Sequence, residues 1–159
     1  MIIGVDFDGT VVTHEYPEVG RDIGAVPVLK KLVNQGHRII LFTMRSHMKH
    51  NERDTLNDAV SWFKKNNIPL FGINENPTQK SWTSSPKPHC NIYIDDAALG
   101  IPTVDNPDGR PYVDWPRVEE MLKEKGVLPE EKEPAEDADS ERKRVIKEGV
   151  TEVLRSLID

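Results

Sequence analysis

The sequence predicts an α/β fold, a three-layer Rossmann-like parallel sheet with helices on both faces. Short apolar runs rich in β-branched residues alternate with segments of helical period along the chain, which favours parallel strands joined by right-handed crossovers. Several of these runs end at acidic residues or a threonine. The composition, with 36% hydrophobic and 30% charged residues, is typical of a globular domain.

Four runs predict the strands of this sheet, and each is a short buried stretch of the kind that parallel sheets contain. The first and the last lead directly into acidic residues. The four predicted strands are Met1–Val5, Arg38–Thr43, Pro69–Ile73 and Asn91–Ile94.

Three segments predict helices. Residues 25–35 carry apolar side chains at helical spacing and are followed by Gly36, a typical helix stop. Residues 51–67 repeat the pattern. Residues 115–125 form a closing helix with Pro116 near its first position, where proline is favoured.

The composition changes after Leu128, which predicts a domain of residues 1–128 and an appendage of residues 129–159. Residues 129–139 are acidic and lack large apolar side chains, so they predict a linker. The segment from Ser140 onward carries an apolar stripe near helical period. This C-terminal helix could dock on a protein surface or join two copies of the chain.

Chemistry-bearing residues follow three of the predicted strands. The first strand ends in Asp6-Phe7-Asp8-Gly9-Thr10, the second in Thr43, and the fourth in Asp95-Asp96. The carboxyl ends of parallel strands meet at one edge of a sheet, where ligands bind. Carboxylates crowded together repel unless a cation lies among them, and oxygen ligands favour Mg²⁺ over Zn²⁺. We therefore expect a magnesium site at this edge.

These residues resemble the signature of the haloacid dehalogenase (HAD) superfamily, D-x-D-G-T after the first strand, a threonine after the second and paired acids after a late strand. The resemblance covers about residues 1–125. It implies phosphoryl transfer through an aspartyl phosphate, with Asp6 as nucleophile and Asp8 as general acid and base. Magnesium would be held by the Asp6 carboxylate, the Asp8 carbonyl and Asp95, with Asp96 bracing them.

The resemblance also implies that Thr43 and a lysine bind phosphoryl oxygens. Lys87 is favoured for this role because it comes shortly before the fourth strand, and Lys80 is the alternative. Neighbours of the motifs are expected to contact the substrate, since backbone N–H groups in the bend can hold phosphoryl oxygens and an arginine can bind a phosphate. These neighbours are Phe7, Gly9, Thr10, Met44 and Arg45.

No segment is long enough for the cap domain that this superfamily often carries. Residues 11–24, with His14 and Tyr16, make only a flap, and residues 74–89 make only a loop. The expected protein is a capless phosphatase with an open site, which takes phosphorylated small molecules or the terminal phosphate of something larger. Because the domain is close to neutral, we expect no tracking along duplex nucleic acid.

Two other activities stay open. A receiver-like phosphoacceptor module also gathers acids, threonine and lysine around magnesium, but its acid pair precedes the phosphoacceptor, the reverse of the order here. A phosphotransferase would use the same aspartyl chemistry. The single cysteine, Cys90, the absence of a basic N-terminal leader and of a run of about 20 apolar residues favour a cytoplasmic protein without membrane partners.

Overall fold

The structure is a computed structural model that describes residues 1–47, 49–50 and 53–130. The chain divides into two units, Met1–Leu128 and Pro129–Asp159. Nearly all of the second unit, with the expected linker and C-terminal helix, lies outside the described residues, so those features stay predictions.

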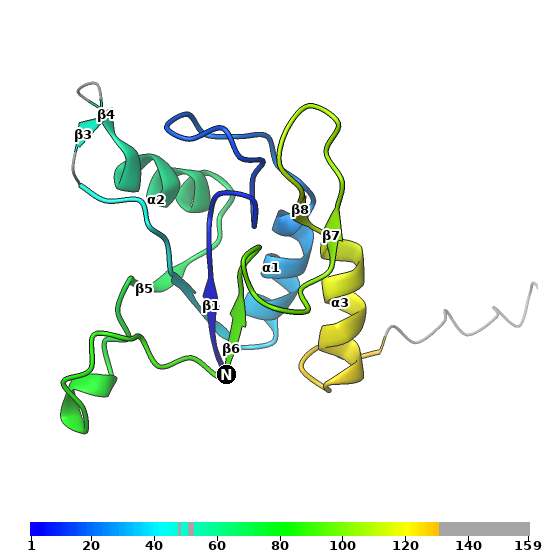
Figure 1. Cartoon of the computed structure of the whole chain (residues 1–159). Helices are drawn as coiled ribbons and strands as arrows, with labels where there is room; N and C mark the ends of the chain where they lie inside the picture. Colours follow the sequence, from blue (N-terminus) through cyan, green and yellow to red (C-terminus); the bar gives the residue numbers. More distant parts are fainter. Residues whose placement is uncertain (48, 51–52, 131–159) are drawn as a thin grey trace, which may run out of the picture. The chain divides into compact units, whose positions relative to one another are not determined.

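The first unit is built on a four-stranded parallel sheet, which confirms the predicted α/β, Rossmann-like architecture (Figure 1). Its strand order is β5-β2-β1-β6. All three pairings are parallel, and β1 lies between β2 and β6. The strands are β1 (Ile2–Val5), β2 (Arg38–Leu41), β5 (Leu70–Ile73) and β6 (Ile92–Ile94).

The three helices begin and end where local signals in the sequence require. In α1 (Ala25–Asn34) the chain turns away afterwards through Gly36, at φ +80°. The helix α2 (Thr55–Lys65) starts at Asp54, whose carboxylate accepts the N–H of Asn57. In α3 (Trp115–Glu124) Asp114 caps the first turn in the same way.

The helices cover one face of the sheet, which corrects the expectation of helices on both faces. Successive strand residues point to opposite faces, and Ile3, Val5, Ile39 and Leu41 belong to one apolar core together with the buried residues of α1, α2 and α3. Ile40 points to the other face and lies outside this core, although it is buried.

A loop covers part of the second face. Residues 74–91 connect β5 to β6 with only the 3₁₀ turn η1 (Gln79–Ser81), where a doubly wound sheet would carry a helix. The Tyr93 hydroxyl donates to the carbonyl of Pro88 at 2.5 Å, and a Cβ on Gly4 would lie 3.0 Å from Cys90 Sγ. The missing helix has a local reason, because Pro77, Pro86 and Pro88 interrupt this segment.

Two short hairpins were not predicted from the sequence. One pairs β3 (Lys49–His50) with β4 (Arg53–Asp54), and the other pairs β7 (Thr103–Val104) with β8 (Tyr112–Val113). The second lies between β6 and α3 in the chain, and it brings its loop toward the carboxyl ends of the strands (Figure 1).

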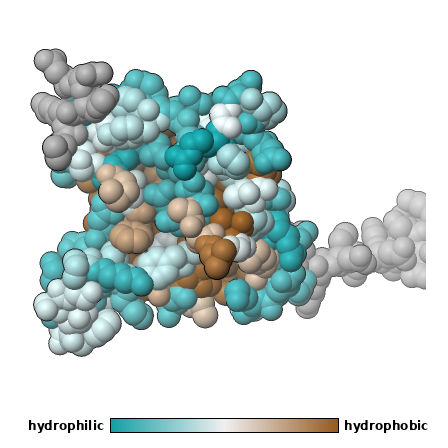
Figure 2. Space-filling model, viewed as in Figure 1, coloured by the Kyte–Doolittle hydropathy of each residue, from teal (hydrophilic) through white to brown (hydrophobic). Residues whose placement is uncertain are grey.

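The two edge strands of the described sheet are β5 and β6. Beside β6, a hollow of about 180 Å³ between this strand and α3 is lined mainly by apolar side chains, including Leu99 and Met121. Figure 2, which has the viewpoint of Figure 1, shows apolar surface near the middle of the molecule, bordered by hydrophilic residues. Among the described residues, no helix combines the length and the apolar character that crossing a membrane requires.

Candidate active site

The three strand ends converge on one cavity, as predicted. The connections from β1 lead through β2 to β5 on one side, and the chain then returns to place β6 on the other side of β1. This reversal is the point where parallel α/β sheets bind ligands. The cavity measures about 500 Å³ and is lined by Asp6, Asp8, His14, Tyr16, Thr43, Met44, Arg45, Asp95, Asp96, Ala97 and Arg110.

Three carboxylates meet in this cavity. Asp6, Asp95 and Asp96 each place an oxygen so that these atoms all lie within 4.8 Å of one another. One oxygen of Asp6 accepts the hydroxyl of Thr10 at 3.4 Å, and Asp95 Oδ1 accepts the N–H of Ala97 at 2.8 Å. The loops after β1 and β6 therefore hold these acids together despite their like charge.

Asp6 titrates unlike an ordinary aspartate. Burial is the main cause that raises the pKa of Asp6, to about 7, and the negative charges of Asp95, Asp96 and Asp8 raise it further, while a hydrogen bond from the Phe7 backbone opposes the shift. The carboxylate form of Asp6 is thus costly in the protein alone, and a cation among the three acids would relieve that cost.

The residues present fit a bound magnesium ion. Three clustered carboxylate oxygens are hard ligands of the kind that Mg²⁺ takes from proteins, and the cavity leaves room for the waters that Mg²⁺ usually keeps. Asp6, Asp95 and Asp96 are the described side chains that would hold it. The Asp8 side chain is not part of this triad.

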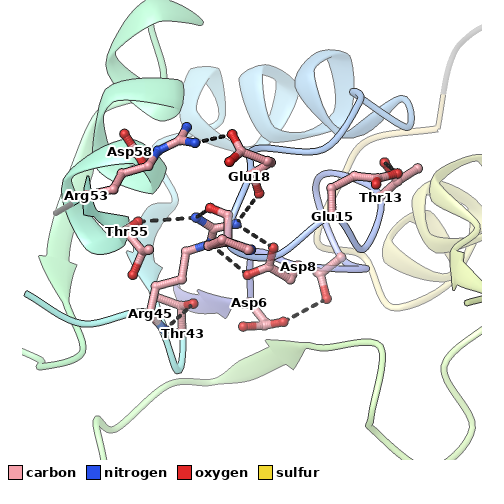
Figure 3. A network of polar contacts seen from close by, with 12 residues as sticks. Asp6, Asp8, Thr13, Glu15, Glu18, Thr43, Arg45, Arg53, Thr55 and Asp58 are labelled. Carbon is pink, nitrogen blue, oxygen red and sulfur yellow. Dashed lines mark hydrogen bonds and ion pairs between the residues drawn. The ribbon is translucent and has the colours of Figure 1, made fainter. Parts of the chain in front are cut away.

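Asp8 instead forms a fork-shaped ion pair with Arg45 (Figure 3). Arg45 Nε donates to Asp8 Oδ2 and Nη2 donates to Asp8 Oδ1, both at 2.7 Å. The Arg45 side chain is 1% exposed. The pair therefore fixes the direction of the Asp8 carboxylate next to the triad, with the geometry of the strongest arginine–carboxylate contacts.

Arg45, expected to bind the substrate, lines the cavity, but its N–H groups donate to other parts of the protein. Its remaining N–H groups donate to the carbonyls of Pro17 and Thr55, at 3.2 and 3.4 Å, and of Glu18, at 2.6 Å. Its guanidinium also lies 4.9 Å from the centre of the Phe7 ring. With every donor engaged, Arg45 joins Asp8 to the flap of residues 11–24 and to the start of α2.

A second arginine also holds the flap, through an ion pair. The Arg53 side chain, at the start of α2, donates to a carboxylate oxygen of Glu18 and, at 2.5 Å, to Asp58 (Figure 3). The flap is therefore held to the α2 end of the domain by two arginines.

The other residues of the second strand end lie as expected. Thr43 is buried and lines the cavity, and its hydroxyl accepts the N–H of Arg45 at 3.1 Å. Its own N–H donates to Asn74 Oδ1 at 2.8 Å, which ties the ends of β2 and β5. Met44 is 97% exposed at the cavity, so it can touch a ligand.

Phe7, Gly9 and Thr10 have structural side-chain roles instead of the expected substrate contact. Phe7 is fully buried against Trp62 and Phe63. Thr10 Oγ1 accepts the N–H of Asp96 at 3.0 Å and so joins the two acidic loops. Gly9, at φ +78°, is packed so closely that a Cβ would lie 2.0 Å from His14 Nε2. Their backbone is engaged as well, since the N–H of Gly9 donates to the carbonyl of Val12 at 2.7 Å and the N–H of Thr10 donates to the carbonyl of Phe7 at 3.2 Å.

The structure does not bring the expected lysine to the cavity. The Lys87 ammonium lies 5.3 Å from the centre of the Tyr93 ring, in the loop before β6 and thus toward the amino end of that strand. Lys80 pairs with Glu75 at 3.3 Å and is largely exposed. Neither lysine lines the cavity, so the described residues offer other cations there.

Four lining residues had no role assigned from the sequence, namely Ala97 and three with polar side chains. His14 and Tyr16 reach the cavity from the flap, and His14 Nε2 lies 2.9 Å from Asp96 Oδ2. Arg110 reaches it from the β7–β8 loop, with Nη2 3.9 Å from the same oxygen. The turn signal Asn106-Pro-Asp-Gly-Arg, between the strand-favouring pairs Thr103-Val104 and Tyr112-Val113, could have indicated this hairpin.

Comparison with known proteins identifies a relative by sequence and structure together. No family model matches the chain, and no curated protein matches it either. A solved structure described as that of a conserved protein from Bacteroides thetaiotaomicron matches over 79% of this chain and 91% of its own length, with 35% identity and a TM-score of 0.62. The chain therefore belongs to the same protein family as this conserved Bacteroides protein.

Proposed function

We propose that this protein is a magnesium-dependent phosphatase of the HAD type, which hydrolyses phosphate monoesters through an aspartyl phosphate on Asp6. The observation that carries the proposal is the meeting of Asp6, Asp8, Thr43, Asp95 and Asp96 around one cavity at the strand ends. Side chains of these types in this order along the chain are the superfamily signature, and their convergence supports reading it as a working site.

In the first step of the reaction, Asp6 is the nucleophile. An oxygen of Asp6 attacks phosphorus, a new O–P bond forms, and the ester O–P bond breaks with its electron pair on the departing oxygen. Asp6 is suited to this role because it sits at the end of β1, in the centre of the sheet, and most of its surface is buried away from competing water. A magnesium ion would supply charge neutralisation for the carboxylates and the phosphoryl oxygens.

The second step releases phosphate. Water attacks the phosphorus of the phospho-Asp6 intermediate, its proton goes to Asp8, and the bond between Asp6 and phosphorus breaks to regenerate the carboxylate. In the first step a protonated Asp8 gives its proton to the departing oxygen, so one of its two contacts with Arg45 must open while that proton is bound, and the second step restores the proton. Arg45 fixes the orientation of the Asp8 carboxyl group. Thr43 lines the cavity, where its hydroxyl group can contact the phosphoryl group.

The test is phosphate release from a panel of phosphate monoesters. Asp6→Asn should lower turnover by about 10³-fold or more, because the amide cannot form the phosphoenzyme. Asp105→Asn, on an exposed acid outside the cavity, is the matched control and should keep its activity. Substantial turnover by Asp6→Asn would contradict the proposal.

The metal requirement is tested on the same panel. Chelation by EDTA should abolish turnover and Mg²⁺ should restore it, because the three acids otherwise repel an incoming phosphate. Restoration by Zn²⁺ but not by Mg²⁺ would contradict the oxygen-ligand assignment. Repeated turnover also separates an enzyme from a receiver, which stops after one phosphoryl group.

A further inference from the structure

A phosphatase site needs a cationic side chain for the phosphoryl oxygens, and the described part of this cavity offers three candidates. They are Arg45, His14 and Arg110. The expected lysine is absent from the lining, so the role falls to one of these three. Their hydrogen bonds decide between them.

Arg45 and His14 are already engaged. The five N–H groups of Arg45 are used by Asp8 and by the carbonyls of Pro17, Glu18 and Thr55. His14 Nε2 lies against Asp96, and its ring packs over Gly9. A substrate could bind Arg45 or His14 Nε2 only by breaking contacts that hold the site together.

Arg110 differs from Arg45 and His14 in its exposure and in its hydrogen bonding. Its side chain is 73% exposed, and its distance of 3.9 Å to Asp96 is too long for a hydrogen bond. Its guanidinium therefore keeps N–H groups that can face a ligand in the cavity. A guanidinium fork also matches two oxygens of a phosphoryl group better than an ammonium does.

The hairpin that carries Arg110 is attached to the loop that carries the acids. Val113 donates its N–H to the carbonyl of Gly9 at 2.9 Å, and the Trp115 indole N–H donates to the carbonyl of Thr10 at 2.6 Å. Within the turn, Gly109 donates to the carbonyl of Asn106 at 3.1 Å. These contacts keep the hairpin, and with it Arg110, beside the acidic loops, while the Arg110 side chain is 73% exposed.

We propose that Arg110 binds the phosphoryl oxygens of the substrate, in the place of the lysine that the sequence predicted. This inference rests on the proposed function and adds its phosphate-binding residue. It makes the β7–β8 hairpin part of the substrate site, and it makes Arg45 a positioning residue that acts through Asp8.

The test measures the binding of orthophosphate to the magnesium-loaded full chain by calorimetry, and its inhibition of ester hydrolysis. Arg110→Gln should raise the dissociation constant of phosphate by about ten- to hundred-fold, the value of one or two charge-assisted hydrogen bonds. Arg110→Lys should recover part of this loss. Because Arg110 is exposed, the melting temperature should not change.

The control is Arg117→Gln, on an arginine of α3 that pairs with Glu120 and Glu124 and does not line the cavity. It should bind phosphate as the wild type does. Equal affinity in Arg110→Gln and wild type, or equal losses in both variants, would overturn the assignment of Arg110. Phosphate binding that depends on Arg110 in a protein that releases no phosphate from esters would overturn the proposed function and support this assignment.

Discussion

Arg45 and Arg110 line the same cavity, but their surroundings are opposite. Arg45 is buried and donates two hydrogen bonds of 2.7 Å to Asp8. Its other N–H groups donate to backbone carbonyls. Arg110 is 73% exposed and makes one long ion pair. The comparison shows that proximity to a motif in sequence does not decide what an arginine does. The role of an arginine depends on which of its N–H groups have no partner in the folded protein, and the surrounding residues determine this.

The largest effect that separates the two arginines should be on stability. Arg45→Gln leaves the Asp8 carboxylate and the flap carbonyls without their partner, and it should lower the free energy of unfolding by about 3–5 kcal/mol. Urea unfolding measures this change. Arg110→Gln, measured in the same way, should stay within about 0.5 kcal/mol of wild type.

Arg45→Lys keeps the charge and removes the fork, so it sharpens this result. It should recover part of the stability but leave ester turnover low, because Asp8 loses its fixed direction. If Arg45→Lys and Arg45→Gln lost only affinity for phosphate, with stability intact, Arg45 would be a substrate ligand after all.

A second effect compares the two acids of the loop after β1, Asp6 and Asp8. Asp8 has Arg45 as a partner, whereas the pKa of Asp6 is raised from 3.8 to about 7, mainly by burial. In the metal-free protein, folding therefore takes up a proton at Asp6 between these two pH values. The free energy of unfolding should fall as pH rises through this window, by at most about 4 kcal/mol.

The measurement is the difference in unfolding free energy between wild type and Asp6→Asn in EDTA across that window. Carboxyl groups distant from Asp6 contribute equally to both proteins and cancel in the difference, which leaves Asp6 and its coupling to Asp8, Asp95 and Asp96. The wild type should lose stability relative to the variant as pH rises, and saturating Mg²⁺ should reverse the trend. A difference independent of pH would show that Asp6 titrates normally.

The smallest effect concerns the predicted lysine. Lys87 lies over Tyr93 and outside the cavity lining, so Lys87→Ala should change kcat/KM by no more than about two-fold. Lys80→Ala should behave in the same way. A large loss for Lys87→Ala alone would restore the role expected from the sequence and would weaken the assignment of Arg110.

The strands and the acids were predictable because their signals are local. Short apolar runs that end in Asp6, Thr43 and Asp95 specify both buried strands and the edge at which their ends meet. The helices followed from their period and their stops. The parallel order then required only that alternating strands and helices cross over in the usual hand.

The features that sequence reasoning missed depend on contacts between distant segments. The β7–β8 hairpin has strands of two residues and is anchored through Gly9 and Thr10, so no periodicity could reveal it. The hydrogen bonds that occupy the N–H groups of Arg45 include two to carbonyls of the flap. The second face of the sheet carries no helix because residues 74–91 connect β5 to β6 as a loop, an outcome that the predicted loop of residues 74–89 already implied.

The most direct test of the central claim is to trap the phosphoenzyme. Asp8→Asn, acid-quenched during turnover of an aryl phosphate with Mg²⁺, should carry up to one phosphoryl group per chain, because a good leaving group departs without a general acid whereas hydrolysis of the intermediate still needs the base. Borohydride reduction followed by peptide mass spectrometry should place the modification at Asp6. A modification at another residue, or turnover by the wild type with no trapped species in either protein, would contradict the account of Asp6 as the nucleophile.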